Sequence, residues 1–83
     1  MEREIFCRGD SMRPLFRPGD RIRFAPCRAE ELRRGDVIIF TSPGQGERVV
    51  HRVVSTGPGG IRTKGDANPR ADSWDIRQSN LTG

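Results

Sequence analysis

The sequence predicts a mainly β protein, built as either a small antiparallel β-barrel or a folded sheet. Ten glycines and six prolines divide the 83 residues into short segments. No window repeats apolar residues at helical spacing over the length that a stable helix needs. The segments between the breaks are rich in β-branched and aromatic residues, which are enriched in strands.

Five segments are predicted to be strands, at residues 5–8, 21–24, 37–41, 48–55 and 61–64. Turn signals rich in glycine, proline and aspartate separate them, at residues 17–20, 34–36, 42–46 and 57–60. The Pro-Gly segment after Thr41 predicts a hairpin between two long strands. Residues 29–32 are expected to form one helical turn.

The length of the chain predicts a single domain over residues 1–83, because 83 residues do not supply two independent cores. The longest apolar stretch, residues 37–40, is far shorter than the roughly 20 residues of a membrane-spanning helix. The first residues also lack the apolar centre of a signal peptide. The sequence as given therefore shows no membrane segment.

The net charge of +4 and the pI near 10.4 make nucleic acid and an anionic membrane surface partners to consider. The arginines are scattered, and the densest pairs stand beside acidic residues, so a solvated surface is expected and nucleic acid is not. Cys7 and Cys27 are expected to be free thiols. His51 has no second imidazole or nearby thiol at ligand spacing, so neither a metal nor another cofactor is predicted.

Ser11 is the candidate nucleophile. It lies in the run Gly9-Asp10-Ser11-Met12-Arg13-Pro14, where glycine allows unusual backbone angles and proline stiffens the exit. A serine hydroxyl needs a neighbouring base to take its proton. By itself, however, a Gly-Asp-Ser triplet is most often a simple turn.

His51 is the candidate base. On an extended strand it shares a face with Val49 and Val53. An apolar surrounding favours the neutral imidazole that a general base requires. A lone histidine on such a face is nevertheless more often a structural core residue.

Further motifs follow Ser11 in a fixed order: Gly19-Asp20, Gly35-Asp36, His51-Arg52-Val53 and Lys64-Gly65-Asp66-Ala67-Asn68, with Asp72 beyond them. Over nearly the whole chain this series resembles the signal peptidase I family, in the branch found in archaea, in the endoplasmic reticulum and in some bacteria. The resemblance implies that Ser11 is the nucleophile. It also implies that His51 replaces the more common lysine as the general base.

The third catalytic member is one of two aspartates. By the same resemblance Asp72 is expected to orient His51, while Asp66 shapes or supports the site. A carboxylate in this role fixes the histidine tautomer and stabilises the imidazolium. The alternative that both are turn aspartates at strand ends stays open.

The resemblance implies a serine endopeptidase that cleaves signal peptides of preproteins after small residues, one and three positions before the cut. It implies the fold shared by signal peptidases and self-cleaving repressors, no cofactor, and a membrane-associated catalytic domain on the extracytoplasmic side. Family members carry a membrane helix before the serine, which is not in this sequence. Residues 81–83 resemble the start of a last family strand.

Three alternatives remain. A self-cleaving repressor-like domain would use a lysine base, and Lys64 is the only lysine. A small basic β-barrel would bind nucleic acid through stacked aromatic residues, but the five aromatic residues are spread along the chain. The domain would also be inactive if it needs the absent membrane segment and last strand.

Overall fold

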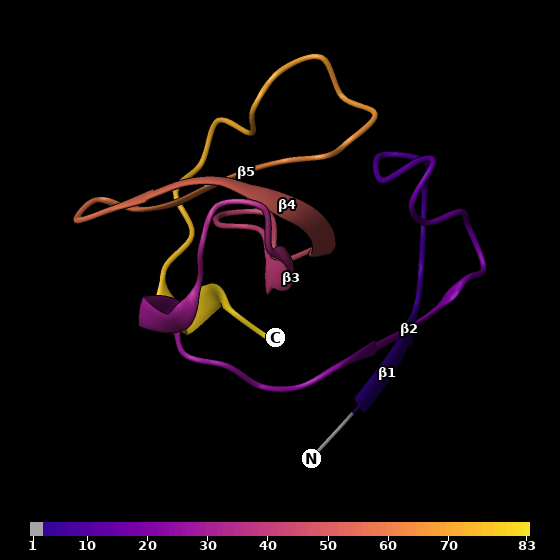
Figure 1. Cartoon of the computed structure of the whole chain (residues 1–83), viewed down its shortest axis with the longest axis horizontal. Helices are drawn as coiled ribbons and strands as arrows, with labels where there is room; N and C mark the ends of the chain where they lie inside the picture. The colour runs from indigo at the N-terminus through magenta and orange to yellow at the C-terminus, as the bar shows by residue number, and fades with distance from the viewer. Residues whose placement is uncertain (1–2) are drawn as a thin grey trace.

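Two antiparallel sheets make up the fold (Figure 1). The computed structural model describes residues 3–83. The first sheet pairs β1 (Arg3–Phe6) with β2 (Arg21–Phe24), and the second has the order β3 (Val37–Thr41), β4 (Arg48–Gly57), β5 (Gly60–Lys64). The helical elements of residues 3–83 are two 3₁₀ turns, η1 (Ala29–Glu31) and η2 (Gln78–Asn80). The mainly β prediction is confirmed, and residues 3–83 form folded sheets rather than a closed barrel.

The predicted strands are all present, with shifts at some ends. β1 begins two residues earlier than predicted because Arg3 and Glu4 also pair with β2, and the chain bends at Gly9, whose φ is 74°. Cys7, just beyond β1, still bonds to the segment before β2, since its N–H donates to the Asp20 carbonyl at 2.7 Å. β4 and β5 extend to Gly57 and Gly60, which pair across a two-residue turn. The predicted hairpin after Thr41 is confirmed by the pairing of β3 with β4.

The core has two parts. One cluster, Ile38, Phe40, Val53, Ile61 and Ile76, belongs to the three-stranded sheet and the segment that covers it. The other contains Cys7, Ile22 and Ile39, with Val50 packed against it. Cys7 and Ile22 come from the side of the first sheet and Ile39 from β3, so this second cluster holds the two sheets together.

The last three described residues lie along the outer edge of β3. Leu81 forms a bridge with Phe40, and the Thr82 N–H donates to the Ile39 carbonyl at 2.7 Å. The Ile39 N–H in turn donates to the Gly83 carbonyl at 2.8 Å. Gly83 also lies so close to Phe24 of β2 that a Cβ there would be 2.6 Å from the ring. This segment therefore contacts both sheets.

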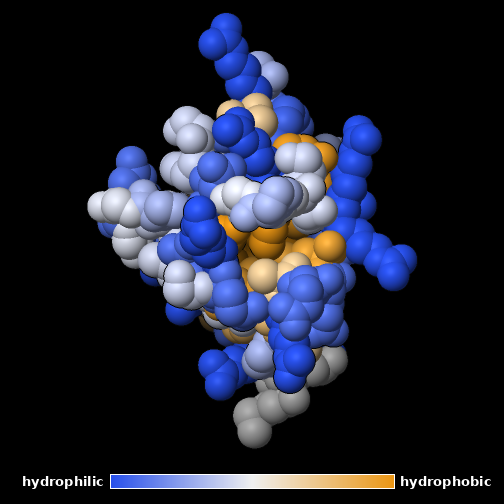
Figure 2. All heavy atoms as spheres, turned by 90° about the vertical axis from the view of Figure 1, so that its left-hand side faces the viewer, coloured by the Kyte–Doolittle hydropathy of each residue, from blue (hydrophilic) through white to orange (hydrophobic). Residues whose placement is uncertain are grey.

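The face that carries η1 and the tip of the β4–β5 hairpin is mostly hydrophilic, with apolar side chains visible in a hollow (Figure 2). The hollow is lined by residues of η1, the hairpin and η2, among them Leu32, Ile61 and Ile76. The 3₁₀ turn η1 and the tip of the β4–β5 hairpin lie on the opposite side of the molecule from the β1–β2 connection (Figure 1). Among residues 3–83, no helix has the length and apolar character needed to cross a membrane.

Candidate active site

Ser11 lies in a tight turn of the β1–β2 connection. The Arg13 N–H donates to the Asp10 carbonyl at 3.1 Å, and the Phe16 N–H donates to the Met12 carbonyl at 2.9 Å. The Met12 side chain, 1% exposed, anchors this turn in the protein interior. A buried anchor directly after Ser11 limits the positions that the serine hydroxyl can take.

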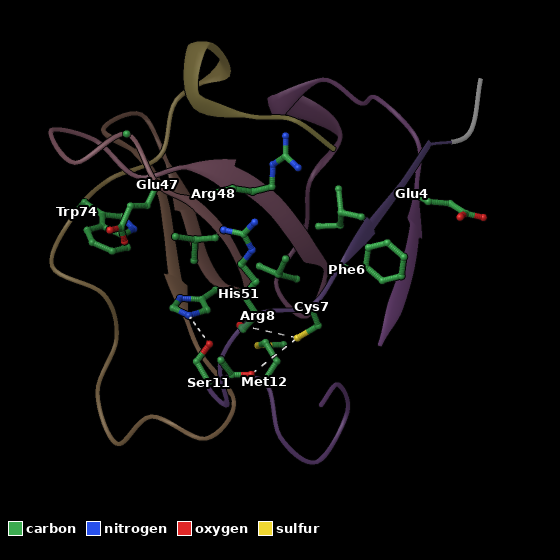
Figure 3. A pocket seen from close by; sticks show the side chains of 15 residues that line it. Glu4, Phe6, Cys7, Arg8, Ser11, Met12, Glu47, Arg48, His51 and Trp74 are labelled. Atoms are coloured by element: carbon green, nitrogen blue, oxygen red, sulfur yellow. Dashed lines mark hydrogen bonds between the residues drawn. The ribbon is translucent and has the colours of Figure 1, made fainter. Parts of the chain in front are cut away.

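His51 of β4 faces this turn from the other sheet. Its Nε2 atom lies 3.1 Å from Ser11 Oγ (Figure 3). The imidazole is buried, with Phe40 edge-on at a centroid distance of 6.2 Å. The pair therefore joins a side chain of β4 to one of the β1–β2 connection at hydrogen-bonding distance.

Asp72 completes a continuous hydrogen-bonded chain. Its Oδ2 atom lies 2.6 Å from His51 Nδ1. A carboxylate only accepts hydrogen bonds, so the neutral ring carries its hydrogen on Nδ1 and leaves Nε2 free to accept from Ser11. The resemblance favoured Asp72 over Asp66 as the carboxylate beside His51, and in the structure Asp72 is the aspartate that contacts His51.

Thr63 of β5 holds Asp72 in place, a role that the sequence analysis did not assign. Its hydroxyl donates to Asp72 Oδ2 at 2.6 Å, and its carbonyl accepts from the Asp72 N–H at 2.8 Å. The Thr63 side chain is fully buried. In a sequence, a threonine on a strand is usually interpreted as a packing residue. The contact with Asp72 depends on the path of the loop after β5, which the sequence does not show.

Asp66 contacts neither Ser11 nor His51 by hydrogen bond. Its carboxylate accepts two hydrogen bonds from Arg52, at 2.9 Å and 2.8 Å, and the Arg52 side chain also donates to the Gly35 carbonyl at 2.8 Å. The hydrogen bond from Arg52 is the main cause that lowers the pKa of Asp66. Asp66 is thus a structural ion-pair partner close to the site.

The turn that contains Asp66 packs directly behind Ser11. The Ala67 N–H donates to the Ser11 carbonyl at 2.8 Å, and the Asp66 N–H lies 3.4 Å from Met12 Sδ. A Cβ at Gly65 would lie 2.8 Å from the Ser11 carbonyl oxygen and 2.9 Å from Ser11 Cβ. Glycine is therefore needed for this close approach.

Two other charged residues near the motifs point elsewhere. The Asp10 side chain is 67% exposed and pairs with Arg13 at 3.1 Å, in agreement with the expectation that it faces solvent. Lys64 Nζ donates to the Gly65 carbonyl at 3.3 Å. The lysine amine has no hydrogen bond to Ser11 that would suit a base.

A cleft of about 1040 Å³ opens beside Ser11 and His51 (Figure 3). Its walls are residues 4–9 along β1 and residues 46–51 along β4, with Met12 and Trp74. Within residues 3–83, β1 pairs only with β2, and β4 pairs with β5 only from Arg52 onward. The cleft therefore lies between two strand edges that have backbone groups free to bond.

Comparison with known proteins identifies the family. A search of curated proteins and a search of solved structures return no match. The family model described as "Signal peptidase, peptidase S26" matches residues 3–68, which contain Ser11, His51 and Asp66 and stop short of Asp72. This match covers most of the chain, and the chain therefore belongs to the signal peptidase family S26, a family of peptidases.

Proposed function

We propose that this protein is a serine endopeptidase in which Ser11 is the nucleophile, His51 the general base and Asp72 the carboxylate that orients His51. The observation that carries the proposal is the unbroken chain from Ser11 Oγ through both ring nitrogens of His51 to Asp72, with distances of 3.1 Å and 2.6 Å. Nucleophile, base and orienting group within hydrogen-bond reach are the arrangement that activates serine.

The reaction follows from this geometry. Ser11 Oγ attacks the carbonyl carbon of the scissile peptide while its proton moves to His51 Nε2. Asp72 stabilises the resulting imidazolium through Nδ1. His51 then gives the proton to the leaving amine nitrogen, which leaves an ester on Ser11. A water molecule, deprotonated by His51, attacks that ester, and the proton returns to Ser11 Oγ as the acid product leaves.

The backbone around Ser11 supplies a donor for the negative charge that develops on the carbonyl oxygen. Among residues 3–83, the Ser11 N–H has no backbone partner, unlike the N–H groups of Arg13 and Phe16 in the same turn. A preorganised N–H aimed at a developing oxyanion lowers the barrier of acyl transfer. The Ser11 N–H is the donor we assign to the oxyanion.

The cleft suits an extended peptide. In an antiparallel pair, alternate residues point their backbone N–H and C=O groups to opposite sides. Cys7 bonds toward β2, so the neighbouring Phe6 and Arg8 present these groups to the cleft. A substrate strand can bond to this edge and to the edge of β4 across the cleft, as in other peptide complexes formed by strand addition.

The substrate that we propose is a signal peptide of a preprotein, with small residues one and three positions before the cut. Family membership supports a peptidase that processes such peptides. Its members act at membranes, and we place this catalytic domain on the extracytoplasmic side, next to a membrane surface. No cofactor takes part in the proposed reaction.

Cleavage of a labelled peptide with an Ala-x-Ala site, in the presence of detergent or lipid, tests the proposal. We expect Ser11→Ala and His51→Ala to lose at least about 10³-fold in kcat, because each removes a member of a group that acts as a unit. Ser55→Ala, an exposed serine on β4, is the matched control and should keep full activity. Cleavage by both site variants at the parent rate would show that the assignment is wrong.

A further inference from the structure

We infer that Arg8 and Arg48 form a subsite that selects substrates with a carboxylate side chain a few residues from the scissile bond. The inference rests on the proposed peptidase function and adds a substrate preference to it. Both arginines line the cleft, Arg8 from the segment after β1 and Arg48 from the first residue of β4. Figure 3 shows both guanidinium groups extending into the space between these two strands.

The two guanidinium groups carry charge that the described protein does not neutralise. Both side chains are exposed, and within residues 3–83 neither lies within 4.0 Å of a carboxylate. Like charges on the two walls of one cleft repel each other. An anionic group that enters the cleft removes this repulsion and gains two partners.

The acidic residues of the cleft do not cancel this charge. Glu4 is already bound by Arg21 and Arg23, each at 3.5 Å. Glu47 belongs to the turn before β4 and lies on the Trp74 side of the view in Figure 3. Apolar residues, among them Val50 and Cys7, also line the cleft and pack against each other.

The position of the subsite along the substrate follows from the sequence distance between each arginine and the Ser11–His51 pair. Arg8 stands three residues before Ser11, and Arg48 stands three residues before His51. An extended strand rises about 3.3 Å per residue, so the Arg48 backbone lies about 10 Å from His51 along β4. The chain from Arg8 to Ser11 bends at Gly9, so the Arg8 backbone lies no farther than about 10 Å from Ser11. A substrate side chain two to five residues from the cut can therefore reach them. Guanidinium binds carboxylate with two parallel hydrogen bonds, a geometry that a neutral amide side chain matches poorly.

Peptide binding to the Ser11→Ala protein tests the subsite without turnover. The probes are fluorescent Ala-x-Ala peptides with one glutamate placed second, fourth or fifth before the cut or third after it, each matched by a glutamine peptide. We expect at least one glutamate position to bind about fivefold tighter than its glutamine match at low salt. This gain should shrink in 0.5 M salt, because the arginines are exposed.

The arginine variants decide whether this preference belongs to the cleft. In the Ser11→Ala background, Arg8→Gln and Arg48→Gln should each remove most of the glutamate gain. Arg34→Gln should keep it, since Arg34 is exposed, has no carboxylate partner among the described residues and lies outside the cleft. Equal binding of glutamate and glutamine peptides, a gain that survives both cleft substitutions, or no binding of any glutamate peptide overturns the inference.

Turnover by the unmodified protein separates the subsite from the peptidase proposal. We expect kcat/KM to show the same glutamate preference as binding. Cleavage without charge preference would overturn the subsite and leave the peptidase assignment standing. Preferential binding without any cleavage would overturn the peptidase assignment and leave the subsite standing.

Vesicles of phosphatidylcholine with and without phosphatidylglycerol test a lipid role for the same arginines. We expect Arg8→Gln and Arg48→Gln to leave vesicle binding unchanged. If instead they reduce binding to the anionic vesicles and change no peptide affinity, the two arginines recognise lipid headgroups, and the substrate preference is wrong.

Discussion

Thr63 links the strand β5 to the chemistry of the site, because its hydroxyl donates to the carboxylate oxygen of Asp72 that also binds His51. We expect Thr63→Val to lower kcat about tenfold with little change in KM, since the carboxylate loses a donor and its orientation. Stability should fall by about 1 kcal/mol, the usual net value of a hydrogen bond.

The conservative variant separates these two effects. Thr63→Ser keeps the hydroxyl and should restore most of kcat even though it loses a buried methyl group. A Thr63→Val protein with unchanged kcat, or a Thr63→Ser protein as slow as Thr63→Val, would show that the hydrogen bond has no part in positioning Asp72.

Gly65 lies so close to Ser11 that the geometry of the site requires a residue without a side chain at this position. In Gly65→Ala the new Cβ would lie 2.8 Å from the Ser11 carbonyl oxygen, so the backbone must shift. We expect kcat to fall about 10–100-fold, since small displacements of a nucleophile are costly. Gly59→Ala is the control, because a Cβ there has no atom within 4 Å. Equal activity of the two variants would contradict this account.

At the level of elements, the Arg52–Asp66 ion pair ties β4 to the turn behind Ser11. The pKa of Asp66 is lowered, chiefly by the hydrogen bond from Arg52, so its ionised form stabilises the fold. That contribution is fully present above the unfolded-state pKa of about 4 and is lost as the pH falls through the lower folded pKa.

We therefore expect Asp66→Asn to be less stable than the parent by about 1 kcal/mol at pH 7, a modest value because the pair is partly exposed. The difference should shrink as the pH falls below about 4. Urea unfolding at both pH values measures it. A difference that stays constant from pH 7 to pH 2.5 would contradict an ion-pair origin.

The elements also show how far the sequence predicts the structure. The bounds of β2 and β3 agree with the prediction to the residue, because turn residues flank both the alternating pattern of β2 and the apolar run of β3. The bounds of β1 differ from the prediction, since the bend at Gly9 depends on packing of the following turn.

The resemblance assigned Ser11, His51 and Asp72 to one site, and the distances between these side chains agree with that grouping. The Thr63 and Arg52 contacts depend on loops after β5, whose path no local pattern encodes.

At the scale of the whole molecule, the cluster of Cys7, Ile22 and Ile39 docks the two sheets. We expect Ile39→Ala to lower the free energy of unfolding by about 2–4 kcal/mol, because its side chain is 2% exposed and leaves a cavity. Leu15→Ala, at a residue 49% exposed, should cost much less. Urea unfolding followed by circular dichroism measures both, and equal losses would argue against an apolar contact between the sheets.

The Ser11–His51 contact joins the connection between β1 and β2 to strand β4 of the other sheet. Under the proposed mechanism, a chain whose two sheets have formed but not yet docked lacks the Ser11–His51 contact and cannot cleave peptides. In rising denaturant, hydrolysis should therefore stop before the far-ultraviolet circular dichroism signal of the strands declines. Under the proposed mechanism, hydrolysis therefore reports the docked arrangement of the two sheets.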